Sequence, residues 1–137
     1  MTTPMKLNDN VLIELFENCT LEPSLFTHLN QLRISWLLID KHGLEKAVVK
    51  YSNLKEQYYI KVLKSNKFNL ALTKAYIEIL HHFMERSTAN DFDKLMREFP
   101  RLKFNFKELV KTHYGYNILK EHRKEEPNPL KPILFTF

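Results

Sequence analysis

Glycine occurs only twice in this chain of 137 residues, as Gly43 and Gly115. Tight β-hairpins usually need glycine or an Asn-Gly pair to reach positive φ angles, so a chain this poor in glycine has few ways to build an antiparallel sheet. Leucine, lysine and glutamate, which are frequent here, favour helices instead. The sequence therefore predicts an all-α fold.

The pattern of apolar residues predicts five or six helices within one domain. A chain of this length, with 44% hydrophobic residues, is large enough to bury a single core. Apolar residues recur at helical spacing and stop at Pro, Gly or capping residues. The predicted helices cover 9–19 (cap Asn8 or Asp9), 25–42 (cap Ser24 or Thr27, end Gly43), 44–64, 70–86, a short helix capped within 87–91 and ending before Pro100, and 105 to His113 or Tyr114, before Gly115.

The two ends of the chain are expected to differ from this helical body. Residues 1–8 read as a flexible N-terminus. Residues 125–137 hold three of the six prolines, which predicts an extended arm. Because this arm ends in Leu134, Phe135 and Phe137, we expect it to pack across the bundle. We therefore predict one helical domain over residues 1–137.

Composition and charge restrict the compartment and the partners. Cys19 is the single cysteine, so no disulfide can form within the chain. Its simplest interpretation is a buried or half-buried small apolar residue. No secretory signal and no run of about twenty apolar residues is seen, so we expect a cytoplasmic protein without membrane contact. The net charge of +5 makes this a basic protein and permits an acidic partner without requiring one.

A basic surface is predicted on the helix at 44–64. Between residues 46 and 74 there are seven lysines and one acid, Glu56. Four of the lysines fall opposite the apolar side of the helix, and we call them the lysine face: Lys46, Lys50, Lys61 and Lys64. This face is either simply solvated or the contact surface of an interaction module for an acidic protein or nucleic acid. Nucleic acid is the less favoured partner, because arginines and stacking aromatics are missing.

Polar side chains interrupt the apolar helix at 25–42 and nominate a site. On a helix, His28, Gln31 and Ser35 point within about 60° of one another, beside apolar residues. They either satisfy hydrogen bonds inside the core or line a small polar pocket between helices. In the second case they face Asn69, Thr73 and Tyr76 of the helix at 70–86.

Three further residues complete the candidate ligand site. Arg33 points about 140° away from the polar strip, where it can pair with Asp40 or anchor the C-terminal arm. His113 and Tyr114 fall in the last turn of their helix, where they either cover the pocket or cap that turn. We assign all of these residues to the candidate site.

Catalytic and metal-binding patterns are weak. The six histidines form no HExxH motif, and there is no GxSxG nucleophile motif or phosphate-binding glycine loop. We therefore expect no native metal and no cofactor, and we assign no catalytic residue. An enzyme with His28 or His113 as a general base is kept as a second alternative.

Several motifs together resemble those of an uncharacterised family of small bacterial all-helical proteins. The resemblance spans about residues 10–134 and rests on Phe26, Thr27, His28, Leu32, Arg33 and Trp36, then Lys67, Phe68, Asn69 and Thr73, then Phe99, Pro100 and Leu102, then His113, Tyr114 and Gly115, and finally Glu126, Pro127 and Leu130. It implies a shared pocket but no established activity. Gln31 and Asn69 replace histidines of the family pattern, and neither side chain can transfer protons near neutral pH.

The leading hypothesis is therefore a helical protein that binds a small polar molecule, with catalysis unproven. The main alternative is an interaction module that uses the lysine face. Self-association is compatible with the sequence, but no face is specified for it.

Overall fold

The computed structural model describes residues 8–114, with side chains as far as Lys111. Over this range the backbone forms α-helices and one short 3-10 helix, and no strand. The predicted all-α class is thus confirmed for the described residues. Residues 1–7, the C-terminal arm at 125–137 and Gly115 lie outside this range, whereas Asn8, assigned above to a flexible terminus, caps the first helix.

The helices follow the predicted order closely. Each begins and ends as follows: α1 Asp9–Glu17, η1 Pro23–Leu25, α2 His28–His42, α3 Leu44–Lys61, α4 Leu70–Glu85, α5 Phe92–Glu98, α6 Arg101–Phe104 and α7 Phe106–Tyr114. The six predicted helices correspond to α1–α5 and α7. Gly43, with φ of +85°, separates α2 from α3, as its position in the sequence predicted.

The predicted helix at 25–42 begins later than expected, because Pro23–Leu25 form η1 and Thr27 caps α2. The predicted helices at 9–19 and 44–64 end earlier than expected, and left-handed residues explain why. Cys19 has φ of 56° and Lys64 has φ of 52°, in the region where a helix made of L-residues cannot continue. Accordingly α1 ends at Glu17 and α3 ends at Lys61. After α1 the chain turns back, and the amide of Thr20 donates to the Leu15 carbonyl at 2.8 Å.

The short helix α6 was missed because Pro100 was taken only as a stop signal. Proline also suits the start of a helix, since its φ is fixed near the helical value and its missing N–H has no intrahelical partner there. Pro100 has φ of −58°, and its carbonyl accepts from the amides of Lys103 and Phe104 at 3.0 Å.

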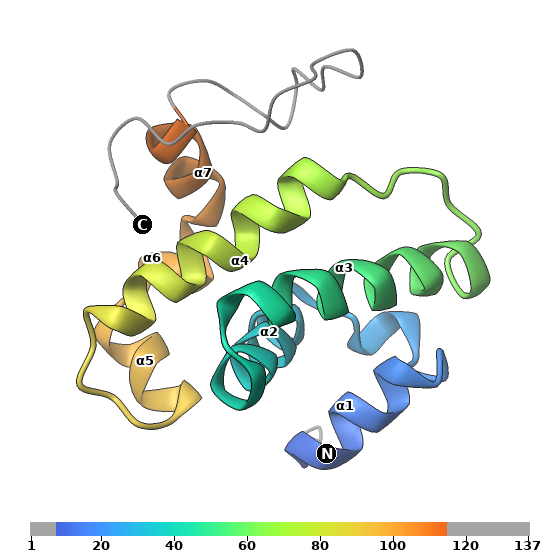
Figure 1. Ribbon diagram of the computed structural model, residues 1–137, viewed down its shortest axis with the longest axis horizontal. Coiled ribbons are helices and arrows are strands. Elements are labelled where there is room, and N and C mark those ends of the chain that lie inside the picture. The colour runs from blue at the N-terminus through green and yellow to red at the C-terminus, as the bar shows by residue number, and fades with distance from the viewer. Residues whose placement is uncertain (1–7, 115–137) are drawn as a thin grey trace, which may run out of the picture.

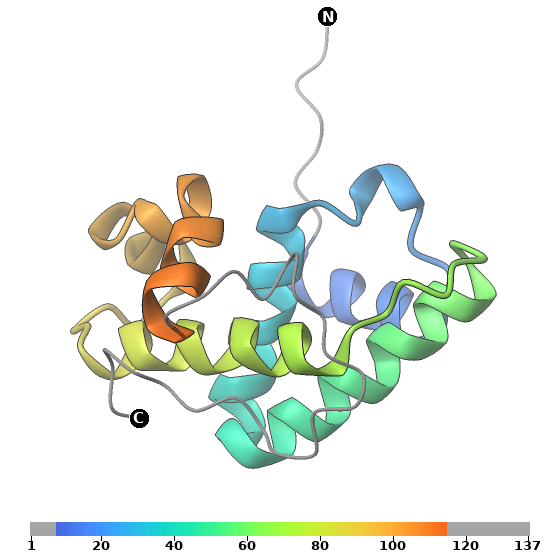
Figure 2. The ribbon, with the colours of Figure 1, turned by 90° about the horizontal axis from the view of Figure 1, so that it is seen from above.

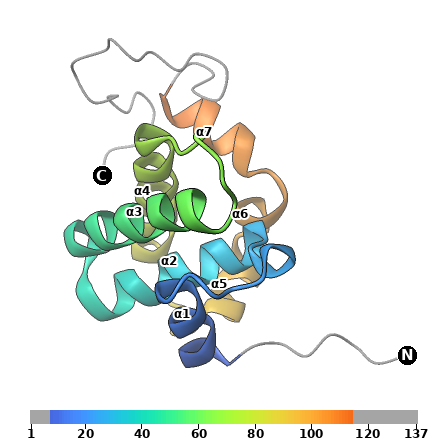
Figure 3. The ribbon, with the colours of Figure 1, turned by 90° about the vertical axis from the view of Figure 1, so that its right-hand side faces the viewer.

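Three long helices form the centre of the fold. Helices α2, α3 and α4 all pack against one another, and Figure 2 shows α2 running across α4. Helix α1 packs on α2 and α3, while α7 packs on α4 and α6 (Figure 1). Figures 1 and 3 place α1 and α7 on opposite sides of this trio. The trio therefore encloses the interior in which the predicted site residues lie.

Aromatic rings fill the end of the core beside α1. The ring of Phe16 stacks on Phe26 at 5.6 Å and lies 5.8 Å from the ring of Tyr51. Tyr58 packs 4.5 Å from Phe26 and donates its hydroxyl to the Leu21 carbonyl. These contacts fix α3 against the chain that leads into α2. None of the described helices is both long enough and apolar enough to cross a lipid bilayer.

Candidate functional site

His28 is the first residue of α2, and both of its ring nitrogens are engaged. Nε2 lies 2.9 Å from the carbonyl oxygen of Leu102 in α6, and Nδ1 lies 3.0 Å from the hydroxyl of Tyr76 in α4. A carbonyl can only accept, so Nε2 carries the hydrogen and Nδ1 is an acceptor. The one hydroxyl hydrogen of Tyr76 has two acceptors within reach, Nδ1 and the backbone carbonyl of His28 at 3.1 Å. Burial lowers the pKa of His28, the Leu102 carbonyl offsets part of this effect, and the charge of Lys55 lowers the pKa further. The ring is therefore neutral at pH 7.

Gln31 and Ser35 continue the polar strip one and two turns along α2. The Gln31 amide donates to the Phe26 carbonyl at 3.3 Å, and its oxygen accepts from the Tyr51 hydroxyl at 3.3 Å. The Ser35 hydroxyl donates to the backbone carbonyl of Gln31 at 2.8 Å. These residues thus make hydrogen bonds within the core, and Gln31 joins α2 to α3.

Lys55 of α3 was not predicted as a site residue. Only 8% of it is exposed, and its Nζ lies 5.6, 5.8 and 5.5 Å from the ring centres of Tyr51, Tyr59 and Tyr76. No described residue gives this Nζ a hydrogen bond or an ion pair. Burial lowers the pKa of Lys55 to about 8. The amine is held by aromatic rings in place of a counter-charge.

These side chains form what we call the interhelical cluster: His28 and Gln31 from α2, Tyr51 and Lys55 from α3, and Tyr76 from α4. Helix α7 covers it, because the ring of Phe106 lies 5.2 Å from His28 and 4.6 Å from Tyr76. Of the predicted polar strip, His28 contacts Tyr76, while the predicted polar pocket between these helices stays a prediction. The side chains of His113 and Tyr114 lie outside the described range, so their role stays a prediction.

Asn69 and Thr73 use their polar atoms in the first turn of α4. Asn69 Oδ1 accepts from the amide of Leu72 at 3.0 Å and so caps the helix. The Thr73 hydroxyl donates to the Asn69 carbonyl at 2.8 Å. These bonds give both residues a structural role, whether or not they also touch a ligand.

Arg33 points away from the interhelical cluster, as predicted, but its partners differ from the predicted Asp40. Its guanidinium lies 3.1 Å from Asp9 of α1 and 3.1 Å from Asp93 of α5. It also lies 4.6 Å from the ring centre of Phe92. The buried Arg33 therefore joins α1, α2 and α5, and its anchoring of a C-terminal arm lies outside what is described.

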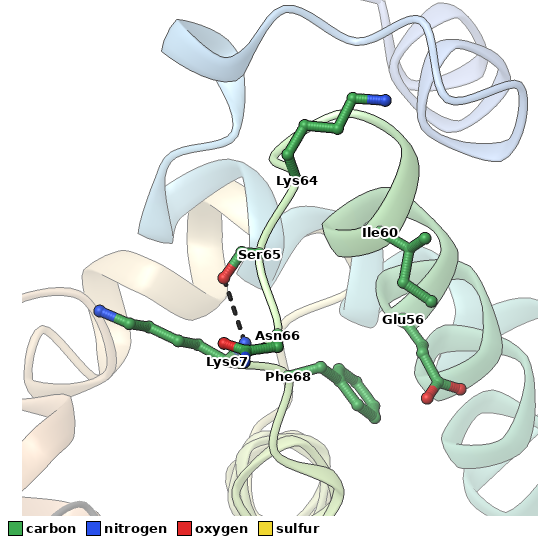
Figure 4. Close-up of a pocket in the computed structure, with 7 residues that line it drawn as sticks. All are labelled: Glu56, Ile60, Lys64, Ser65, Asn66, Lys67 and Phe68. Atoms are coloured by element: carbon green, nitrogen blue, oxygen red, sulfur yellow. Dashed lines mark hydrogen bonds between the residues drawn. The ribbon is translucent and has the colours of Figure 1, made fainter.

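The lysine face is largely exposed. Lys50 pairs with Glu17 of α1 at 3.5 Å, whereas Lys46, Lys61 and Lys64 are exposed and form no ion pair with any described residue. A surface hollow of about 760 Å³ lies where α3 leads into α4 (Figure 4). It is lined by Glu56, Ile60, Lys64, Ser65, Asn66, Lys67 and Phe68. Figure 4 shows Lys64 and Lys67 pointing away from each other, so their charges do not converge on one ligand.

Residues 8–111 contain no group of three or more histidine, cysteine or carboxylate side chains placed to hold a metal ion. The comparison with known proteins adds no assignment: no family model, curated protein or solved structure matches the chain. The family inferred from the motifs therefore stays a prediction.

The signal for Lys55 was present in the sequence. At about 100° per residue, Lys55 falls about 40° from Tyr51 and about 60° from Tyr58, inside the apolar side of α3. A lysine in this position must either reach solvent with its long side chain or lie buried.

Proposed function

We propose that this chain binds a small polar molecule at the interhelical cluster, between α2, α3 and α4. Lys55 carries the proposal, because only 8% of the residue is exposed and its amine has no hydrogen bond or ion pair from any described residue. Burying an ammonium group without a counter-charge costs several kcal/mol, and contacts with aromatic rings offset only part of that cost. A ligand that accepts a hydrogen bond from Nζ would remove this deficit.

A ligand bound at the amine of Lys55 would also contact the tyrosine rings beside it. Tyr59 is the half-buried ring of the three that surround Nζ, whereas Tyr51 and Tyr76 are buried. Rotation of Tyr59 would therefore widen the approach from solvent to the amine. Tyr59→Ala is expected to speed ligand association while leaving the contacts of Tyr51 and Tyr76 in place.

Thermal unfolding with a panel of small polar molecules, neutral and charged, tests the proposal. We expect at least one class to raise Tm, at both low and high salt, because buried contacts are weakly screened. The rise should vanish in Lys55→Met and persist in Lys61→Met, which removes an exposed lysine from the same helix. A response that Lys55→Met leaves intact would place the ligand elsewhere.

The exposed lysines favour a second candidate, an interaction module for an acidic protein. Lys46 and Lys61 on α3, together with Lys64 just beyond its end, are exposed and have no counter-charge among the described residues. Retention on an immobilised polyanion should fall steeply with salt, and replacing the three lysines by glutamine should remove it. Retention that survives high salt would argue against this candidate.

General-base catalysis by His28 or His113 stays a prediction without direct support. For His28, both ring nitrogens already have partners, so the Tyr76 hydroxyl would first have to release Nδ1. A cytoplasmic location and the bacterial family likewise stay predictions.

A further inference from the structure

A second buried polar group near Lys55 lacks a partner. The hydroxyl oxygen of Ser52 is buried and has no hydrogen bond to any described residue, and only 6% of Ser52 is exposed. Ser52 precedes Lys55 by three residues, so the two side chains leave α3 about 60° apart and about one turn apart along its axis. A buried hydroxyl without a partner is unusual in a folded protein, and here it adjoins a largely buried lysine whose amine also lacks one.

Both groups can donate hydrogen bonds, which restricts what could satisfy them. The ammonium of Lys55 has three N–H groups and no acceptor, and the Ser52 hydroxyl offers one O–H. The nearby His28 is neutral, and no described carboxylate pairs with Lys55. A group that satisfies both side chains would therefore carry one negative charge and oxygen atoms that accept hydrogen bonds.

The surroundings restrict the ligand further. Three tyrosine rings surround Nζ, and their faces favour an apolar or aromatic body over a polar one. A single buried cation balances one negative charge, so a phosphate dianion would leave excess charge away from water.

We propose that the site takes a small organic monocarboxylate, with its carboxylate on the Lys55 ammonium and the Ser52 hydroxyl. This inference rests on the proposed function and specifies its ligand class. The tyrosine rings would hold the apolar part of the acid, and the ion pair would form away from water.

Matched pairs of an acid and its neutral amide provide the test. We would titrate benzoate and acetate against benzamide and acetamide, with inorganic phosphate as a further arm, and follow Tm. Benzoate is expected to raise Tm by several degrees, more than acetate, while the amides and phosphate have little effect. Ser52→Ala should weaken benzoate binding about tenfold, because a hydrogen bond to a charged group is lost.

Two controls keep the test decisive. Lys61→Met should bind benzoate normally, and Lys55→Met should not bind it. Should Lys55→Met fold poorly, NMR titration of the lysine Nζ groups in the unaltered protein replaces it, since bound benzoate must raise the pKa of Lys55 from about 8. Equal stabilisation by benzoate and benzamide would overturn the monocarboxylate class while leaving small-molecule binding intact. No Tm change with any small molecule would overturn both proposals.

Discussion

The two basic side chains of the interhelical cluster bind protons less tightly in the folded protein than in the unfolded chain. Burial lowers the pKa of both Lys55 and His28. For a basic group, a lowered pKa means that the unfolded chain binds more protons in the window between the two pKa values. Unfolding free energy therefore rises with pH across that window for each group.

Replacing Lys55 by methionine is expected to stabilise the free protein at pH 7 by about 1–3 kcal/mol, because an unpaired buried charge is removed and similar volume is kept. The advantage should shrink by up to about 1.4 kcal/mol per pH unit as pH rises above 8, where wild-type Lys55 loses its proton. Urea unfolding of both proteins at several pH values measures the difference in unfolding free energy. Both proteins contain the same tyrosines, so the effect of tyrosine ionisation cancels in this difference. A destabilised Lys55→Met at pH 7 would mean that the charge is compensated.

Acid should destabilise the protein partly through His28. As pH falls below about 6.5, the unfolded histidine gains a proton that the folded ring resists, so unfolding free energy decreases. His28→Gln should make this decrease shallower between pH 7.5 and 5. His82→Gln should also make the decrease shallower, since burial lowers the pKa of His82 as well. An unchanged slope in His28→Gln would show that His28 does not resist protonation.

Helix ends and junctions depend on a few polar side chains. Asn69→Ala should cost about 1 kcal/mol through loss of the α4 cap, whereas Asn69→Asp should keep the cap. Chemical denaturation measures both. If Asn69 only caps the helix, neither variant alters the response to a small ligand, and a lost response in Asn69→Asp would instead place Asn69 in the site.

Arg33 should hold α1 and α5 to α2. Arg33→Ala is expected to lower the unfolding free energy by about 1–3 kcal/mol, because contact with Phe92 and two ion pairs are lost. Asp9→Asn should cost less than about 1 kcal/mol, since Asp9 is about half exposed. Hydrogen exchange should become faster in α1 and α5 of Arg33→Ala. If hydrogen exchange in α1 and α5 of Arg33→Ala equals that of the wild type, apolar contacts alone hold these helices.

The helices could be predicted from the sequence where local signals, such as capping residues, determine their ends. Asn8, Thr27, Asn69 and Asp91 all cap helices near the predicted starts. The ends of α1 and α3 were missed because Cys19 and Lys64, not glycine, take the left-handed conformation there, and local backbone hydrogen bonds close both turns. Helix α6 was missed because Pro100 both ends one helix and starts another.

Only the part of the candidate site that lies on α2 could be predicted from the sequence in any detail. The spacing of His28, Gln31 and Ser35 placed them on one side of α2, and Tyr76 was expected opposite. The bond from His28 to Leu102 joins residues 74 positions apart, and Arg33 meets Asp93 across 60 positions. No local pattern records such pairings. Lys55 was missed because a lysine is usually assigned to solvent.

At the scale of the whole molecule, the mutual packing of α2, α3 and α4 predicts a single cooperative unit. Trp36 is the one tryptophan of the chain and lies beside Phe92, whose helix is α5. Its fluorescence should therefore change at the same urea concentration as the far-UV circular dichroism of all helices. Two separate transitions would contradict the predicted single domain.

The one-residue connection at Gly43 has a consequence for the order of folding. Because α2 and α3 are joined with almost no intervening chain, their pairing closes a very short loop and carries little entropic cost. The hydrogen bond from His28 to Leu102 must wait until three further helices have been placed. The hairpin of α2 and α3 would thus form early, and the interhelical cluster would be completed in the last stage of folding.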